Sequence, residues 1–139
     1  MMRYLLDTAP WANNGLMPEV IPARVQKILD SAETKGLCPV SLLECAIHHR
    51  RGRLQLNGAL SEFFKHGLAA DIELLELTPE IASATNDLPE NFPGDPFDRV
   101  IAATAKVLNL TLITCDFAIR DSRFCKVEFY PFKPSRLKL

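Results

Sequence analysis

The chain has 139 residues, which is enough for one domain with its own buried core, and we expect residues 1–139 to form a single unit. Hydrophobic residues make up 47% of the sequence and charged residues 24%, a balance that excludes a disordered or fibrous protein. The formal net charge of −1 argues against a generally basic surface for nucleic acid, because affinity for phosphate backbones comes mainly from Lys and Arg.

The sequence contains no segment that is typical of a membrane or secreted protein. The apolar run at residues 4–6 is shorter than a secretory signal, and no later run approaches the roughly 18 apolar residues that span a membrane. The cysteines form no C-x-x-C pair, and we interpret them as reduced core thiols: Cys38, Cys45, Cys115 and Cys125. We therefore expect a cytoplasmic protein that does not enter a membrane.

Short apolar runs alternate along the chain with patterns that are typical of helices. The apolar runs predict strands at residues 3–6, 37–40, 72–77, 110–114 and 127–130. The apolar spacing predicts helices at residues 21–32, 42–50, 59–68, 81–87 and 97–108. This alternation predicts a three-layer α/β/α fold around a central, mainly parallel sheet. The short basic tail at residues 133–139 is expected to be frayed.

Prolines mark where several helices begin. Thr78 and Asp95 each stand directly before a proline, so each provides an N-cap side chain followed by a residue suited to the first helical turn. Pro10 disfavours the α conformation at Ala9, so we expect the first helix to begin at or after Pro10.

Four acids fall at strand ends or in the first turns of neighbouring helices. Asp7 closes the first predicted strand and Asp116 closes the fourth. Glu44 follows the second strand, at the start of a helix, and Asp98 begins the helix before the fourth strand. The carboxyl ends of parallel strands form the ligand-binding edge of an open sheet, so we expect the four carboxylates to converge there.

Each acid taken alone also has a structural interpretation. Ser41 precedes Glu44 by three residues, which is the spacing of a capping box. Asp98 is suited to stabilising the positive end of a helix, and aspartate is common in turns such as those after the strands. The functional interpretation therefore depends on the coincidence of all four acids at one edge.

Four carboxylates in one place repel one another unless a cation neutralises them. All-oxygen ligands favour Mg²⁺ or Mn²⁺ over zinc, and Mg²⁺ sites leave coordination positions for substrate phosphates. The acid set therefore predicts metal-dependent hydrolysis of phosphodiester bonds, in which one or two ions activate water for in-line attack and leave a 5′-phosphate.

Four segments together resemble the PIN-domain nucleases, and most of all the VapC-type toxins of bacterial toxin–antitoxin pairs. They are residues 4–8 (YLLDT), 41–54 (SLLECAIHHRRGRL), 95–105 (DPFDRVIAATA) and 110–116 (LTLITCD). The likeness runs in order from Tyr4 to about Tyr130, and the DPFDR block is its most specific part. Instead of the family's usual sequence after Thr8, this chain has Ala9 and Pro10, which puts the shape of the pocket beside Asp7 in question.

The resemblance implies a PIN-like fold and an endoribonuclease that uses Mg²⁺ or Mn²⁺, forms a homodimer and is inhibited by a cognate VapB-like antitoxin. It places the family's catalytic, metal-binding acids on Asp7, Glu44, Asp98 and Asp116. It also places hydroxyl residues on Thr8 and Thr114, which would orient water or phosphate. The RNA substrate is part of what the resemblance implies, because the acid chemistry alone does not separate RNA from DNA.

The resemblance further implies that the antitoxin binds in a groove formed by the early helices. Candidate residues for that surface are Trp11, Phe63, Phe64 and the predicted helix at 21–32. Core packing is the competing interpretation for these side chains, and we favour it for Trp11 because buried aromatic residues are usual.

The densest basic segment follows the second acid, where Arg50, Arg51 and Arg53 come after two histidines. Cations at a helix C-terminus complement its dipole, and this interpretation stands beside a role in guiding RNA phosphates. Adjacent positions on a helix point about 100° apart and neither histidine has a partner at metal-ligand spacing, so His48 and His49 are not expected to bind metal.

Three other functions compete with the toxin interpretation. The first is a PIN-type nuclease that processes RNA without an antitoxin, which the absence of a small neighbouring antitoxin gene would favour. The second is a phosphotransfer receiver module, which would need paired acids after the first strand, whereas Asp7 stands alone. The third is an inactive PIN fold used only for binding, against which the complete acid set argues.

Overall fold

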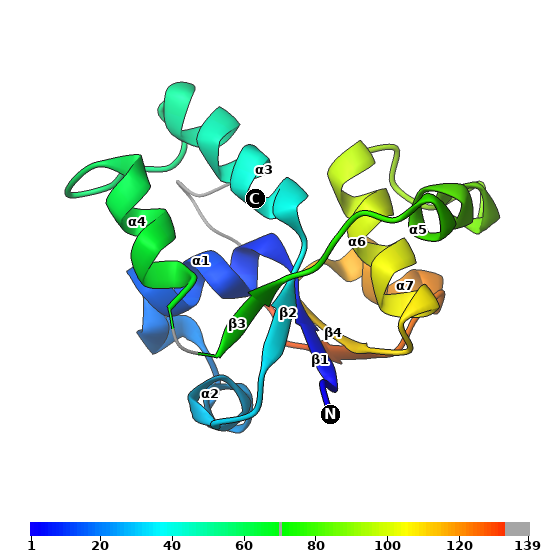
Figure 1. Cartoon of the computed structure of the whole chain (residues 1–139), viewed down its shortest axis with the longest axis horizontal. Coiled ribbons are helices and arrows are strands. Elements are labelled where there is room, and N and C mark those ends of the chain that lie inside the picture. Colours follow the sequence, from blue (N-terminus) through cyan, green and yellow to red (C-terminus); the bar gives the residue numbers. More distant parts are fainter. Residues whose placement is uncertain (70, 133–139) are drawn as a thin grey trace.

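Five parallel strands form the centre of the computed structural model, which describes residues 1–69 and 71–132 (Figure 1). The strands are β1 (Tyr4–Leu6), β2 (Lys35–Leu37), β3 (Ile72–Leu74), β4 (Thr111–Thr114) and β5 (Val127–Phe129). Their order in the sheet is β3-β2-β1-β4-β5, and every neighbouring pair is parallel. The carboxyl ends of all five strands therefore lie at one edge of the sheet. The predicted tail, 133–139, lies outside the described residues.

Helices cover both faces of the sheet (Figure 1). They are α1 (Thr8–Leu16), η1 (Pro18–Val20), α2 (Ala23–Asp30), α3 (Pro39–Arg50), α4 (Leu60–Gly67), α5 (Pro79–Ala84), η2 (Thr85–Asp87), α6 (Pro96–Val107) and α7 (Phe117–Ser122). Successive strand residues point to opposite faces, so Leu6 joins one core cluster with α1 and α2 while Leu5 joins another with α6 and α7. The predicted three-layer α/β/α fold is confirmed.

The prediction for the first helix was wrong, because α1 begins at Thr8 and includes Pro10 in its first turn. The first backbone N–H groups of a helix have no intrahelical partner, so a proline there loses no hydrogen bond. Asp7 caps the helix by accepting from the Thr8 N–H. The cap and the burial of residues 8–13 hold Ala9 in the helix despite the proline that follows it.

The second strand lies earlier in the chain than predicted. It spans Lys35–Leu37 rather than 37–40, because Pro39 occupies the first turn of α3 and starts that helix directly after Cys38. The early start of β2 was not predicted because the strand begins with Lys35, a charged residue that is nevertheless completely buried. The third strand is also shorter than predicted and ends at Leu74.

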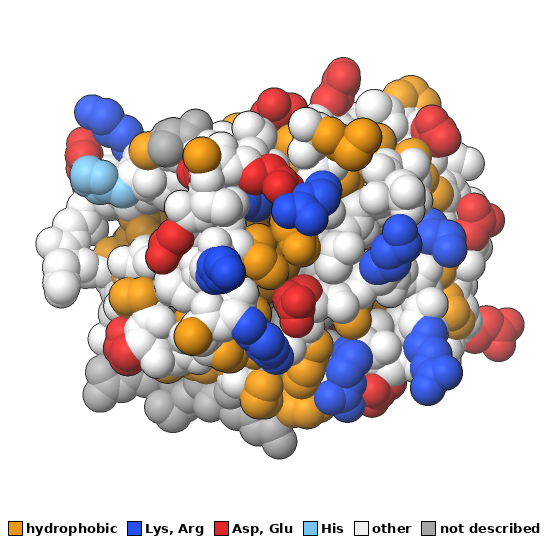
Figure 2. All heavy atoms as spheres, turned by 90° about the horizontal axis from the view of Figure 1, so that it is seen from below, with side chains coloured by type: hydrophobic (Ala, Val, Ile, Leu, Met, Phe, Trp, Pro, Cys, Tyr) orange, Lys and Arg blue, Asp and Glu red, His pale blue; other side chains and the backbone are white. Residues whose placement is uncertain are grey.

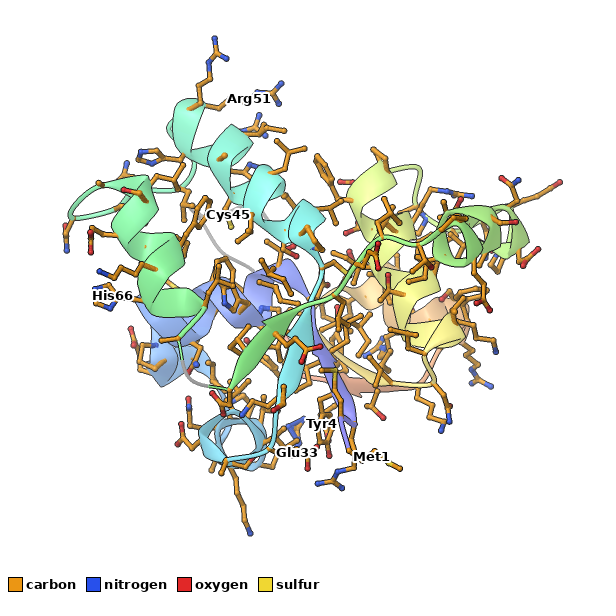
Figure 3. All side chains as sticks on the ribbon, in the orientation of Figure 1. Met1, Tyr4, Glu33, Cys45, Arg51 and His66 are labelled. Atoms are coloured by element: carbon orange, nitrogen blue, oxygen red, sulfur yellow. The ribbon has the colours of Figure 1, made fainter. Side chains whose placement is uncertain are left out.

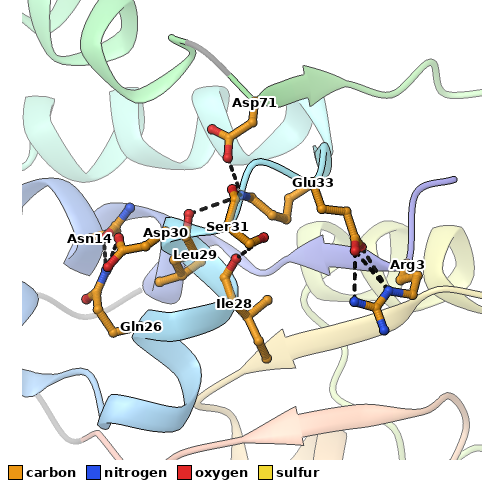
Figure 4. Close-up of polar contacts among 10 residues, drawn as sticks. Arg3, Asn14, Gln26, Ile28, Leu29, Asp30, Ser31, Glu33 and Asp71 are labelled. Atoms are coloured by element: carbon orange, nitrogen blue, oxygen red, sulfur yellow. Dashed lines mark hydrogen bonds and ion pairs between the residues drawn. The ribbon is translucent and has the colours of Figure 1, made fainter.

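Lys35 is buried because its ammonium group finds three acceptors. Its Nζ donates to the carbonyl oxygens of Leu29, at 3.0 Å, and Ser31, at 2.8 Å, and it pairs with the Asp71 carboxylate (Figure 4). This one side chain therefore joins the end of α2, the start of β2 and the segment before β3. A buried charge is tolerated only with such complete pairing.

The remaining elements largely follow the predicted order, with two additions, η1 and α7. The helix α7 was not predicted, because its six residues give too short a pattern to recognise. All four cysteines are free thiols, as expected, and three are buried. Trp11 is buried, packs against Phe63 and Phe64, and donates from its indole to the Gly67 carbonyl at 2.8 Å. Within the described residues, every helix is too short or too polar to cross a membrane.

Candidate active site

Asp7 stands at the end of β1, at the junction with α1, and is almost fully buried. Its Oδ1 accepts from the Thr8 backbone N–H at 2.8 Å, and its Oδ2 accepts from the Thr114 hydroxyl at 2.7 Å. Burial raises the pKa of Asp7, these two hydrogen bonds oppose that rise, and the nearby charges of Asp116 and Asp95 add to it. The carboxylate is thus held in one orientation at the carboxyl edge of the sheet.

Glu44 lies in the second turn of α3, and its carboxylate is tied to the end of β1 through Thr8. The Thr8 hydroxyl donates to Glu44 Oε1 at 2.7 Å and lies 2.8 Å from the Ser41 hydroxyl. The capping-box interpretation of Glu44 was wrong, because α3 begins at Pro39 and Ser41 is inside the helix. Burial raises the pKa of Glu44 to about 7, partly offset by the hydrogen bond from Thr8.

Asp116 follows β4 and is the N-cap of α7, where its Oδ1 accepts from the Ile119 N–H at 3.0 Å. Its own N–H donates to the Thr114 hydroxyl at 3.0 Å, and that hydroxyl donates to Asp7. A continuous set of hydrogen bonds therefore links Glu44, Thr8, Asp7, Thr114 and Asp116 across the edge of the sheet. Both threonines that were predicted to support the site lie between pairs of acids.

Asp98 lies in the first turn of α6, beside the other three acids. Its pKa is raised by burial first, and then by the charges of Asp7, Asp95, Glu44 and Asp116. The charge of Asp95 acts on Asp7, on Glu44 and on Asp98, so this side chain is a fifth acid within electrostatic reach. From the sequence, Asp95 was predicted only as an N-cap, which it also is, accepting from the Phe97 N–H at 2.8 Å.

The donor chemistry of this edge fits a hard divalent cation. The four predicted acids offer only carboxylate oxygens, which suit Mg²⁺ or Mn²⁺. The charges of neighbouring acids also raise the pKa values of Asp7, Glu44 and Asp98, as expected for a site that a cation would neutralise. Within residues 1–69 and 71–132, however, no three His, Cys, Asp or Glu side chains are gathered closely enough to form a ready-made metal-binding group.

His48 is a further neighbour of the site, although no role there was predicted for it from the sequence. It lies one helical turn after Glu44, and its Nε2 is 3.9 Å from Glu44 Oε2. Burial lowers its pKa, and the charges of Arg53 and Arg51 act in the same direction. The spacing of four residues from Glu44 was the available signal. His49 instead contacts the Leu54 carbonyl through Nδ1 at 2.9 Å, closing the turn after α3.

The three arginines predicted to contact RNA lie at and beyond the C-terminal end of α3. Arg50, Arg51 and Arg53 are all exposed, and Figure 3 shows Arg51 pointing away from the body of the protein. Arg51 and Arg53 are near enough to influence His48, so this basic segment borders the acid-lined edge without being part of it.

A separate pocket of about 340 Å³ lies between α1, α4 and the start of β3. Trp11, Phe63, Leu29 and Ile72 give it an apolar wall, and Asp71 and His66 lie at its polar part; His66 is seen on α4 in Figure 3. Trp11 therefore belongs both to the core, as predicted, and to the lining of this pocket.

The family model of the PIN domain matches residues 4–128, and the chain belongs to that family. The resemblance seen in the four sequence segments is thereby confirmed.

Among curated proteins, the chain is 29% identical over 106 residues to ribonuclease VapC22 of Mycobacterium tuberculosis, covering 76% of this chain and 81% of the relative. Among solved structures it is similar to VapBC2 of Rickettsia felis bound to a promoter DNA fragment, with a TM-score of 0.70, 15% identity and coverage of 93% and 98% of the two chains. It is also similar to FitAcB of Neisseria gonorrhoeae, with a TM-score of 0.63, 26% identity and coverage of 92% and 97%.

Proposed function

We propose that this protein is a metal-dependent endoribonuclease and the toxin of a VapBC-type toxin–antitoxin pair. The observation that carries the proposal is the set of hydrogen bonds that ties Glu44, Asp7 and Asp116 together at the carboxyl edge of a PIN-family sheet. A relative that covers most of the chain is named a ribonuclease, which supports RNA as the substrate.

Asp7, Glu44, Asp98 and Asp116 are the residues that would hold the divalent ion, for which Mg²⁺ and Mn²⁺ are the proposed candidates. When bound, such an ion supplies Lewis acidity, which favours deprotonation of water and neutralises charge on the phosphate. Without a cation, the charges of the carboxylates repel one another. This repulsion accounts for the wider spacing of the acids, which form no ready-made ligand group among the described residues.

The neighbouring residues of the chain orient the acids and the substrate. The hydroxyls of Thr8 and Thr114 hold the carboxylates of Glu44 and Asp7 in their orientations, since each donates a hydrogen bond to one of these acids. Arg50, Arg51 and Arg53, which border the edge, would neutralise phosphates of the RNA backbone.

The toxin role follows from the relatives that the fold resembles. The structures from Rickettsia felis and Neisseria gonorrhoeae are named VapBC2 and FitAcB, and the chain covers more than nine-tenths of each with TM-scores above 0.6. For this protein we propose a homodimer with a VapB-like antitoxin, whose apolar side chains occupy the pocket lined by Trp11 and Phe63. An RNA-processing nuclease without an antitoxin is the alternative.

The nuclease activity is tested with purified protein and a fluorescent RNA in the presence of Mg²⁺ or Mn²⁺, with chelator as the blank. We expect metal-dependent cleavage that falls by more than about 100-fold in Asp98→Asn, since even residues that only support a metal ligand contribute about 10- to 100-fold. Asp87→Asn is the matched control, because Asp87 is an exposed acid on η2. Equal activity in Asp98→Asn and Asp87→Asn would contradict the metal-site proposal.

The toxin role is tested by expression in the protein's own host. The wild-type chain alone should arrest growth, and Asp98→Asn should not. Co-expression with the product of an adjacent small gene should restore growth and give a stable complex. A wild-type chain that cleaves RNA in solution and yet is harmless without that neighbour would instead support the RNA-processing alternative.

A further inference from the structure

A second pocket, of about 240 Å³, lies at the opposite end of the sheet from the acids, where α6 and α7 end. We call it the basic pocket. Lys106, Arg123 and Lys126 line it, together with Asn109 and Phe124, and among the described residues that line it none is acidic. Figure 2 views the molecule from this side and shows that Lys and Arg side chains are more numerous on the half of the face where α6 and α7 end.

Two helices connect the acid-lined edge to the basic pocket. The helix α6 begins beside Asp98 and ends beside Lys106, and α7 begins at its N-cap Asp116 and ends at its C-cap Arg123. The six residues of α7 rise by about 9 Å at 1.5 Å per residue. A strand of nucleic acid would therefore cover the distance with only a few nucleotides.

Helix dipoles explain only part of this arrangement. Lys106 and Arg123 stand at helix C-termini, where cations are stabilising. Lys126 belongs to no helix and precedes β5, yet it lines the same pocket. Its side chain and that of Arg123 are in none of the ion pairs found among the described residues, so both charges are available to an anion.

We propose that the basic pocket holds a backbone phosphate of the RNA, a few nucleotides from the bond that is cleaved. This inference rests on the proposed ribonuclease function. A substrate polyanion is repelled by the acids at the catalytic edge unless a metal ion neutralises them, and the formal net charge of the chain is −1, so its attraction must come from local cations. That attraction is located at the far ends of α6 and α7, where the pocket is lined by Lys106, Arg123 and Lys126. The Lys106 ammonium group lies over the Phe124 ring, 5.6 Å from its centroid.

The test measures binding of single-stranded RNA to the full chain carrying Asp98→Asn, so that the RNA is not cleaved, with Mg²⁺ present. Fluorescence anisotropy is recorded for a dodecamer and a trimer over a range of salt concentrations. Adding Arg123→Gln and Lys126→Gln should weaken dodecamer binding severalfold. The negative slope of log K against log salt should become shallower by about 0.7 for each phosphate that the variant no longer neutralises. Trimer binding should be unchanged.

Lys27→Gln with Lys65→Gln is the matched control, because it removes two exposed lysines from α2 and α4 and changes the net charge equally. The control should bind the dodecamer as the Asp98→Asn parent does. Equal weakening by both pairs of substitutions, or an equal loss for trimer and dodecamer, would overturn the proposal. If the wild-type chain cleaves RNA while Arg123→Gln with Lys126→Gln leaves dodecamer binding unchanged, only the basic pocket is refuted. If the wild type neither binds nor cleaves RNA, the proposed function fails.

Discussion

Thr8 is the residue through which two of the acids are connected. Its backbone N–H is bonded to Asp7, while its hydroxyl donates to Glu44 and accepts from Ser41. An ionised carboxylate only accepts hydrogen bonds, so when Glu44 is ionised the single hydroxyl proton of Thr8 is donated to Glu44 and the Ser41 hydroxyl is the donor to Thr8. This buried set of contacts explains why a small β-branched hydroxyl residue follows the first acid.

Replacing Thr8 with valine preserves its shape and removes its hydroxyl. The hydrogen bond from Thr8 lowers the pKa of Glu44, so its loss should raise that pKa further and leave less of the ionised form at neutral pH. In Thr8→Val we expect the acidic limb of the pH profile of RNA cleavage to move to higher pH, with partial recovery of activity at alkaline pH. Thr8→Ser should retain the wild-type profile. An unchanged profile in Thr8→Val would show that the hydrogen bond to Glu44 has no catalytic effect.

Asp95 combines two roles that a pair of substitutions separates. Asp95→Asn keeps an N-cap acceptor but removes the charge that acts on the other acids, so the melting temperature should be unchanged or slightly higher without metal. Its affinity for Mn²⁺, measured by titration calorimetry, should fall severalfold. Asp95→Ala should in addition lose about 1 kcal/mol of stability with the cap. Wild-type Mn²⁺ affinity in Asp95→Asn would restrict Asp95 to capping.

At the scale of elements, the position of β2 depends on Lys35. The strand could begin so early in the chain only because the Lys35 ammonium group is satisfied by the carbonyl oxygens at the end of α2 and by Asp71. Pairing with β1 then places Leu37 beside Leu6, so that Cys38 and Pro39 turn the chain into α3 with Glu44 facing Thr8. A structural lysine away from the acids therefore contributes to where Glu44 lies.

Lys35→Met retains the length of the side chain but leaves the Leu29 and Ser31 carbonyl oxygens without their donor. We expect a loss of about 2–3 kcal/mol in the free energy of unfolding, measured by urea denaturation, because buried acceptors lose their partners. Lys27→Met, at an exposed position in α2, is the control and should change stability little. The folded fraction of Lys35→Met should still cleave RNA. Wild-type stability in Lys35→Met would mean that the buried hydrogen bonds of the ammonium group are worth little.

In the tertiary structure as a whole, charge is separated along the helices α6 and α7. Acids gather at the carboxyl ends of the strands, and Lys106, Arg123 and Lys126 gather at the other end, so that the helices α6 and α7 run from negative to positive side chains. This arrangement complements both helix dipoles, but it concentrates repulsion among buried carboxylates at one edge.

That repulsion predicts a pH dependence of stability in the metal-free protein. Asp7, Glu44 and Asp98 have raised pKa values in the folded state, so the folded protein holds protons that the unfolded chain has already lost, and stability falls as pH rises. His48 has a lowered pKa in the folded state, so it acts in the opposite direction until the unfolded chain has also lost that proton, roughly one pH unit above the ordinary value of about 6.5.

With chelator present, the melting temperature should therefore decrease between about pH 7.5, where His48 is deprotonated in both states, and about pH 8.5. The decrease should be smaller in Asp98→Asn, and added Mn²⁺ should raise the melting temperature more at the alkaline end. Differential scanning fluorimetry provides the measurement. A melting temperature independent of pH over this range, in both proteins, would contradict the repulsion.

The fold class and the positions of the acids along the chain could be predicted from local sequence patterns. Alternation of strands and helices is a local pattern, and an acid that directly follows an apolar strand is visible without the structure, as at Asp7 and Asp116. The helix starts at Thr78 and Asp95 were likewise local, because capping involves residues only two or three positions apart. The metal-binding role of the acids remains a prediction.

The contacts between residues far apart in the chain depend on the tertiary fold and could not be predicted from these patterns. The start of β2 was hidden because burial of Lys35 depends on Asp71, 36 residues away. The contacts of Ser41 and Glu44 with Thr8, 33 and 36 residues away, were also invisible in the local spacing. The basic pocket likewise joins Lys106 at the end of α6 to Arg123 and Lys126 after α7. Local spacing carries no information on contacts between such distant segments, because these form only when the sheet brings its strands and helices into register.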